Sequence, residues 1–269
     1  MYKIDKEKAM FILNKEYDNT IFVLSKGEGS QMTFAETVAT ISNLKVTANA
    51  RDIMLVKSIQ NGLDYLLDKL YYDNLYFDKD TLCMINRYVA ANENFDNIGG
   101  FRKGNIKISG SKNKGIKSSE LDFDFYKLKE YYFNTDKIGI SEMILCLRLA
   151  KSQYFGDGNK RTAQLMMNGL LVTNGYVPLV LNFRDNTVVN ALIKYYDNDD
   201  ILDILKIMLE KQKETTLAYC MENEEIKIKE EYQKDLKFIE NEFKYKVLEQ
   251  EKEQTSSWIK KDIDDDLER

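Results

Sequence analysis

Apolar residues recur at intervals of three and four along much of this chain. One such stripe consists of Ile53, Val56, Ile59, Leu63, Leu66, Leu67 and Leu70, and another of Ile140, Ile144 and Leu147. Residues at this spacing lie on one face of a helix, so both stripes predict helices that turn an apolar face to the core. Proline, which interrupts helices, occurs once, at Pro178. The pattern therefore predicts an all-α fold.

A glycine-rich segment between the two stripes departs from the helical pattern. From Gly99 to Gly110, polar and apolar residues alternate around Gly104 and Asn105. Alternation with a period of two is typical of strands, and glycine beside asparagine is typical of a tight turn. We expect a short β-hairpin over 99–109, and the pattern fits a functional flap and an ordinary connection equally well.

The chain changes character after about Ile207, where lysine and glutamate become frequent. Apolar residues spaced by three or four continue there, at Tyr232, Leu236, Ile239, Phe243 and Val247. This spacing predicts an extended amphipathic helix. One stripe does not say which surface it covers, so an arm for a partner or for self-association and a helix folded back on the chain's own core are equal alternatives.

Composition narrows the classes of function. The 269 residues carry a net charge of -5, which disfavours nucleic acid as a partner because a phosphate backbone attracts a clustered positive field. A local basic cluster keeps nucleic acid as a minor alternative, with Phe101 as a stacking residue; it consists of Lys103, Lys107, Lys112, Lys114 and Lys117. The sequence has no apolar stretch of membrane-spanning length and no secretion signal, so we expect a cytoplasmic protein without a membrane partner.

The chain contains no histidine. This removes the commonest general base near neutral pH and every catalytic triad that depends on it. Cys83, Cys146 and Cys220 are isolated, and we interpret them as core thiols rather than metal ligands. Carboxylates, lysines, arginines, tyrosines and a hard cation such as Mg²⁺ remain for chemistry.

A loop of small residues, Gly156, Asp157, Gly158 and Asn159, leads into an apolar helix that runs from about Lys160 to Thr173. A helix N-terminus presents N–H groups without intrahelical partners and a positive dipole end, and Lys160 and Arg161 add full charges. The loop therefore suits a di- or triphosphate, with Asp157 able to hold Mg²⁺. A plain helix cap with solvated basic residues is the alternative.

These residues resemble the signature of the Fic family, His-Pro-Phe-x-Asp-Gly-Asn-Gly-Arg. Phe155, Asp157, Gly158, Asn159 and Arg161 match it, and Asn159 to Ala163 also matches the related Doc toxins, which carry Asn-Lys-Arg-Thr-Ala. The likeness extends to the segment 99–109, which resembles the family's flap, and to Asn174-Gly175-Tyr176. It implies a Fic-like domain over 33–210, an N-terminal helical extension over 1–32 and a charged C-terminal helical arm over 211–269.

The resemblance also implies a function, the binding of ATP with Mg²⁺ and transfer of AMP to a hydroxyl of a target protein. By position, Asp157 would ligate Mg²⁺, the segment from Gly156 to Lys160 would surround the phosphates, with Gly158 and Asn159 as the anion hole, and Arg161 would contact them. The flap would hold the target protein's extended segment. Its residues are Gly100, Phe101, Arg102, Asn105, Ile106 and Lys107.

Several positions depart from the family pattern. Gln153 stands where the family has its catalytic histidine, and a neutral amide does not accept a proton at ordinary pH. Gln164 stands where many members have a second arginine, and Ser42, followed by Asn43, where an inhibitory helix would carry a glutamate that blocks it. The resemblance thus implies that this latch is lost. Val188 and Val189 replace tyrosines near the family's base-binding pocket.

Three hypotheses follow from these matches and departures. The first is a Fic-fold pseudoenzyme that binds a nucleotide or another anion and acts by engaging a protein. The second is an active transferase of AMP or phosphate that uses a carboxylate such as Asp157, or the substrate's own phosphate, as base. The third is a scaffold in which the motif has no ligand.

Overall fold

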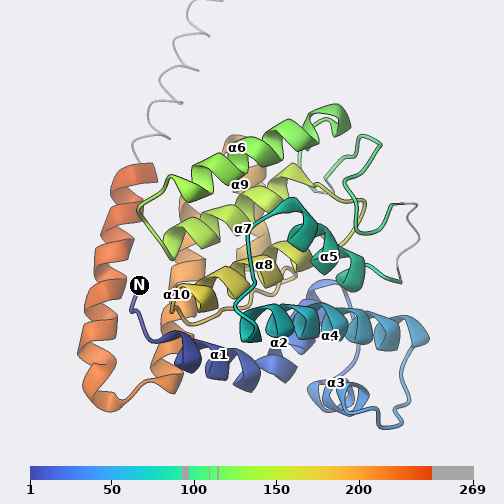
Figure 1. Ribbon diagram of the computed structural model, residues 1–269, viewed down its shortest axis with the longest axis horizontal. Helices are drawn as coiled ribbons and strands as arrows, with labels where there is room; N and C mark the ends of the chain where they lie inside the picture. The colour runs from blue at the N-terminus through green and yellow to red at the C-terminus, as the bar shows by residue number, and fades with distance from the viewer. Residues whose placement is uncertain (93–96, 109, 114, 244–269) are drawn as a thin grey trace, which may run out of the picture.

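The computed structural model describes residues 1–92, 97–108, 110–113 and 115–243, and regular structure in these ranges is helical (Figure 1). The α-helices are α1 (Lys6–Lys15), α2 (Tyr17–Gly27), α3 (Phe34–Ile41), α4 (Ala50–Tyr71), α5 (Lys79–Val89), α6 (Leu121–Phe133), α7 (Ile140–Ser152), α8 (Asn159–Thr173), α9 (Asn186–Asn198) and α10 (Leu202–Tyr219). Residues 225–243 form a further helix, and Ser118–Glu120 and Glu222–Glu224 are short 3-10 turns. The predicted helical architecture is confirmed.

Helix α8 lies at the centre of the molecule (Figure 1). Every residue from Arg161 to Val172 is buried, as expected for a helix that is covered on all sides. Helices α4, α5 and α7 pack around it, and α1 contacts it from the N-terminal part of the chain. The two apolar stripes seen in the sequence form α4 and α7, so their helical spacing positions the walls of this core.

Two amides inside α8 hold the segment that follows it. Gln164 is fully buried; its Oε1 accepts from the N–H of Leu181 at 2.7 Å and its Nε2 donates to the carbonyl of Leu181 at 3.2 Å. One turn further on, Asn168 Oδ1 accepts from the N–H of Leu179 at 3.0 Å. These amides satisfy backbone groups that would otherwise be buried without partners.

The β-hairpin expected over 99–109 is wrong, because no described residue of this segment lies in a strand. Both arms of the loop bind the turn after α7, and Ile108 N also donates to Asn113 O at 3.4 Å across the loop without forming a strand ladder. Arg102 N donates to Tyr154 O at 2.8 Å, and Ile116 N donates to Ser152 O at 3.4 Å. The Arg102 guanidinium further donates to the carbonyls of Gln153 (2.6 Å), Gly104 (2.7 Å) and Ile116. The carbonyls of Gly104 and Ile116 belong to the loop itself, and a strand ladder would need them as backbone acceptors. Ser109 and Lys114 lie outside the described residues.

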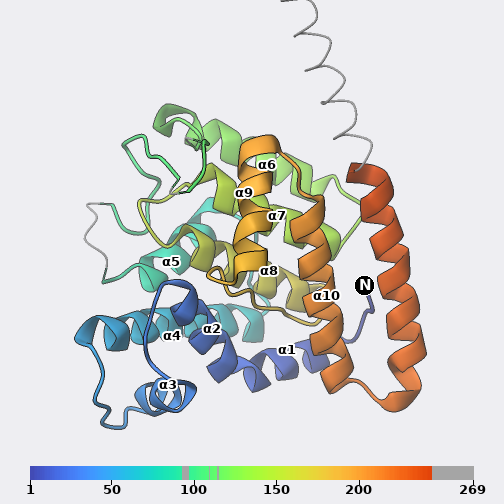
Figure 2. The same ribbon diagram turned by 180° about the vertical axis from the view of Figure 1, so that it is seen from behind.

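Both ends of the described chain pack on the central helices. Helix α2 lies against α4, and Ile12, Leu13 and Ile21 of the N-terminal segment are fully buried. The helix over 225–243 returns along α10 (Figure 2). It buries Ile228 and Ile239, so its described part covers the chain's own core. Residues 244–269 of the expected arm lie outside the described residues, and a partner for the arm stays a prediction.

Within the described ranges, no helix is both long enough and apolar enough to cross a membrane.

Replacing Gln164 with leucine removes both of its hydrogen bonds and keeps the side-chain volume nearly unchanged. The N–H and C=O of Leu181 are then buried without partners, at a cost of about 1–3 kcal/mol for each group. We expect the free energy of unfolding, measured by urea denaturation, to fall by about 2–5 kcal/mol. The control is Gln31→Ala at an exposed glutamine, which should change stability by less than about 0.5 kcal/mol. Equal stability of the two variants would contradict this role of Gln164.

Candidate functional site

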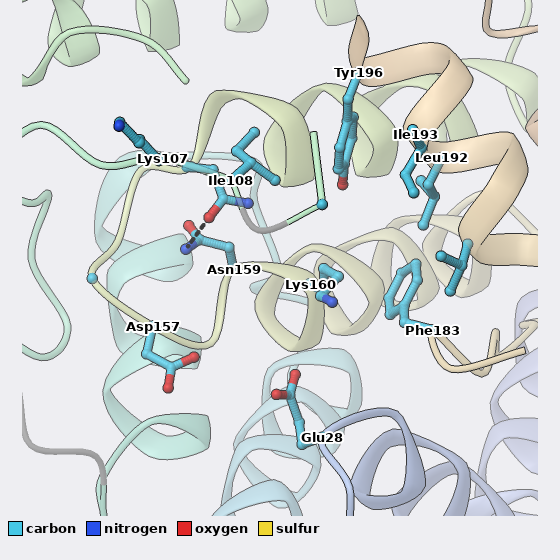
Figure 3. Close-up of a pocket in the computed structure, with 14 residues that line it drawn as sticks. Glu28, Lys107, Ile108, Asp157, Asn159, Lys160, Phe183, Leu192, Ile193 and Tyr196 are labelled. Carbon is cyan, nitrogen blue, oxygen red and sulfur yellow. Dashed lines mark hydrogen bonds between the residues drawn. The ribbon is translucent and has the colours of Figure 1, made fainter. Parts of the chain in front are cut away.

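A cavity of about 360 Å³ opens between the loop before α8, helix α9 and the end of α2 (Figure 3). The volume falls in the range of small-ligand sites. Its walls come from five separate segments of the chain. The lining residues are Glu28, Lys107, Ile108, Gly110, Gln153, Gly156, Asp157, Asn159, Lys160, Phe183, Val189, Leu192, Ile193 and Tyr196.

Two left-handed residues shape the loop between α7 and α8. Gln153 ends α7 with φ 55° and ψ 61°, and Gly158 precedes α8 with φ 76°. A Cβ on Gly158 would lie 3.0 Å from Asn86 Nδ2 and 3.2 Å from Ala90 Cβ, so both the backbone and the space favour glycine. Asn86 Nδ2 also donates to the carbonyl of Asp157 at 2.8 Å. The loop is therefore fixed against α5.

The side chain of Asn159 closes the loop from within. Its Oδ1 accepts from Phe155 N at 2.9 Å, and its Nδ2 donates to Phe155 O at 2.8 Å. The same Nδ2 donates to Gln153 Oε1 at 3.2 Å, as the dashed line in Figure 3 shows. Asn159 thus holds the backbone of the loop in place and positions the amide of Gln153, which the resemblance aligns with the family's histidine.

Gln153 is half-buried and lines the cavity, and both polar atoms of its amide are engaged. Besides the contact from Asn159, Gln153 Nε2 donates to the carbonyl of Ala150 at 2.5 Å. Lys160 enters the cavity from the first turn of α8, with its ammonium 5.3 Å from the ring centroid of Phe183. The helix N-terminus and Lys160 therefore contribute positive charge to one end of the cavity, which the carboxylates of Asp157 and Glu28 also reach.

Arg161 lies behind the loop and outside the cavity lining, with 1% of its surface exposed. Its Nη1 donates to the carbonyl of Val89 at the end of α5, and its Nη2 lies 3.1 Å from Asp157 Oδ1. Its Nε lies 3.3 Å from Glu28 Oε1. In this arrangement the arginine that the family signature assigns to phosphate joins two carboxylates and a helix end.

Two carboxylates reach the cavity, those of Asp157 and Glu28. Asp157 is 32% exposed and also accepts from the N–H of Gly158. A single carboxylate together with phosphate oxygens is a common Mg²⁺ environment, so Asp157 fits the metal role that the resemblance implies. Among the described residues, no three histidine, cysteine or acidic side chains cluster as a metal site without a ligand.

Glu28 was missed by the sequence reasoning. It follows the last turn of α2, and nothing local in the sequence separates it from other surface glutamates; its position becomes meaningful once α2 is placed beside α8. The residues given the inhibitory role are elsewhere. Ser42 and Asn43 are exposed at the end of α3, where Asn43 Oδ1 accepts from Lys57 at 2.8 Å, and Gln164 is in the core.

The expected flap residues divide into two groups. Phe101 packs on Tyr154, with ring centroids 4.8 Å apart, and Arg102 is buried, so these two, together with the adjacent Gly100, anchor the loop. Asn105 Oδ1 accepts from Ser118 N at 2.9 Å. Ile106 is half-buried, whereas Lys107 is exposed and lines the cavity.

The two valines of α9 also separate. Val189 lines the cavity, and Val188 faces a second cavity between α9 and α10. Four of the five residues from Gly156 to Lys160 line the first cavity, and Gly158 supports it from behind. The structure therefore brings Gln153, the loop before α8 and Lys107 into a single site.

This arrangement of helices defines a fold, that of the Fic-domain proteins. A Fic-domain-containing signaling protein from Bacteroides thetaiotaomicron matches with a TM-score of 0.67 at 17% identity, over 80% of this chain and 90% of that one. A fragment of Fic-1 from C. elegans matches with a TM-score of 0.61 at 17% identity, over 79% of this chain and 64% of that one.

A Fic family protein from Desulfovibrio desulfuricans matches with a TM-score of 0.60 at 15% identity, over 76% of this chain and 64% of that one. No protein-family model and no curated protein matches the sequence. The Fic fold expected from the motif is thus confirmed.

Replacing Arg161 with alanine leaves Asp157 and Glu28 without their shared cation. Breaking a buried ion pair by removing one partner typically costs about 3–5 kcal/mol, and we expect this loss in the free energy of unfolding by urea denaturation. Lys160→Ala, one residue earlier and facing the cavity, should cost less than about 1 kcal/mol. If both variants were equally stable, Arg161 would not hold these elements together.

Proposed function

We propose that this protein is a Fic-fold pseudoenzyme that binds a nucleotide, or another ligand with a di- or triphosphate, and acts by engaging a protein. One observation carries the proposal. A formed cavity places Lys160, the N-terminus of α8 and the loop from Gly156 to Asn159 around one space. The amide of Gln153 lines the same cavity, at the position that the resemblance assigns to the family's base.

The geometry at Gln153 supports binding without efficient transfer. An amide does not take the proton of an attacking hydroxyl, and loss of a general base typically lowers the rate by a factor of about 10² to 10⁴. The amide of Gln153 is also held by Ala150 and Asn159, which fixes it as a part of the site's wall. Asp157, the alternative base, has its Oδ1 engaged by Gly158 N–H and Arg161.

Lys160 and the α8 N-terminus would hold the phosphates, and Asp157 would hold Mg²⁺, which neutralises phosphate charge when bound. The apolar residues Val189, Leu192 and Ile193 of α9 form the other end of the cavity and suit the base of a nucleotide. A target protein would dock at the exposed part of the loop near Lys107.

Glu28 opposes phosphate binding, because its carboxylate lies in the cavity and pairs with Arg161. A phosphate at this end meets a negative charge unless Glu28 moves away. Its release would also free Arg161 Nε, 3.3 Å away, for a new anionic partner. We propose that nucleotide binding competes with the contact between Glu28 and Arg161.

Calorimetry with ATP and Mg²⁺ tests this competition. Glu28→Gln keeps a hydrogen-bond acceptor and removes the charge, so we expect binding about three- to tenfold tighter than in the natural protein. Lys160→Ala should weaken binding by about tenfold. Glu214→Gln, at an exposed site on α10, is the control for the loss of one negative charge. Absence of heat with the natural protein and with Glu28→Gln would contradict nucleotide binding.

The role of Gln153 is tested by incubating the protein with cell lysate and ATP labelled on its α-phosphate. We expect no labelled protein with the natural chain and labelling with Gln153→His, since a base then stands at the loop. A double variant, Gln153→His with Lys160→Ala, should label less and serves as control. Labelling by the natural chain at a rate equal to that of Gln153→His would overturn the pseudoenzyme assignment.

A further inference from the structure

Tyr196 lies near the C-terminal end of α9 with 6% of its surface exposed. Its ring points from the helix toward the cavity, and its hydroxyl is directed at the space above Lys160 and Asn159 (Figure 3). No described residue provides this buried hydroxyl with a hydrogen-bond partner. The residue thus places a polar group between the apolar residues of α9 and the N-terminus of α8.

A buried hydroxyl without a partner is costly. Such a group typically lowers stability by about 1–3 kcal/mol, and buried polar atoms in native proteins are rarely left in this state without a functional reason. Phenylalanine would fill the same volume without this cost. The hydroxyl is therefore expected to form a hydrogen bond in a ligand-bound state of the protein.

The position of Tyr196 is fixed by the loop that covers α9. Asn113 Nδ2 donates to the carbonyl of Tyr196 at 2.9 Å. The next residue, Asp197, accepts from the hydroxyl of Ser111 and from Lys112 N, the latter at 2.8 Å. These contacts hold the last turns of α9 against the loop, so the hydroxyl is presented at a defined place in the cavity.

The surroundings indicate the chemistry of the missing partner. Ile108, Leu192 and Ile193 are apolar and lie on the same side of the cavity as the ring of Tyr196, while Lys160 and the α8 N-terminus bring positive charge to the opposite side (Figure 3). Burial raises the pKa of the Tyr196 phenol, so it stays protonated and can donate a hydrogen bond. A ligand that fits has an anionic end and a flat, largely apolar end with a polar atom on its edge.

We propose that the hydroxyl of Tyr196 hydrogen-bonds the edge of the base of the nucleotide held in this cavity and determines which base is preferred. This inference rests on the proposed function, because it assumes that the positive end of the cavity takes the phosphates. It adds a specificity-determining residue that lies outside the loop motif.

The test is calorimetry of the natural protein and Tyr196→Phe with the Mg²⁺ complexes of ATP, GTP, CTP, UTP and inorganic tripolyphosphate. We expect the natural protein to prefer one nucleotide, and Tyr196→Phe to lose about five- to tenfold in affinity for it, so that the preference flattens. Tripolyphosphate, which has no base, should bind both proteins equally.

A matched control is Tyr195→Phe, which makes the same change at the neighbouring buried tyrosine that does not line the cavity, and it should keep the preference. Without ligand, Tyr196→Phe should melt at the same temperature as the natural protein or higher, since it removes an orphan hydroxyl. A marked fall in melting temperature would indicate a structural role and contradict the proposal.

The outcomes separate the two proposals. Nucleotide binding with the same base preference in Tyr196→Phe would overturn the role of Tyr196 and leave the proposed function intact. Binding of tripolyphosphate and all nucleotides with equal affinity by the natural protein would do the same. Absence of binding by any of the five ligands would overturn the proposed function, and the inference with it.

Discussion

The buried guanidinium of Arg161 connects three separate segments of the chain. Its three nitrogen groups meet the end of α5 at Val89, the loop at Asp157 and the end of α2 at Glu28. A buried charge is tolerated where its partners are complete, so the positions of these three segments are interdependent. The N-terminal helices are therefore tied to the site as well as to the core.

This arrangement changes how charge is distributed in the site. An arginine held by two carboxylates contributes little field to the cavity, so attraction for phosphate falls on Lys160 and the start of α8. The amide of Gln153 forms part of the cavity wall and carries no charge. These features support the proposed role in binding an anion.

Features with a local cause could be predicted from the sequence. The stripes of α4 and α7 follow from helical spacing, and the loop from Gly156 to Asn159 follows from residues that suit a turn and a helix start. The expected hairpin failed because its alternation was local while its hydrogen-bond partners were not: Arg102 binds carbonyls on the far side of the loop and after α7. Glu28 reaches the site beside Asp157, more than a hundred residues further along the chain. Tyr196 lies across the cavity from Lys160, about forty residues earlier in the chain. No local pattern in the sequence marks either residue.

The anchoring of the loop by Arg102 has a thermodynamic consequence. Its guanidinium and its N–H bind the carbonyls of Gln153 and Tyr154, so the loop and the ligand cavity share one backbone turn. A protein that docks on the loop and shifts Arg102 would change the shape of that turn. By linkage, the factor by which such a partner alters affinity for the ligand equals the factor by which the ligand alters affinity for the partner. Under the proposed function, this coupling would let the protein report to a second protein whether its cavity is filled.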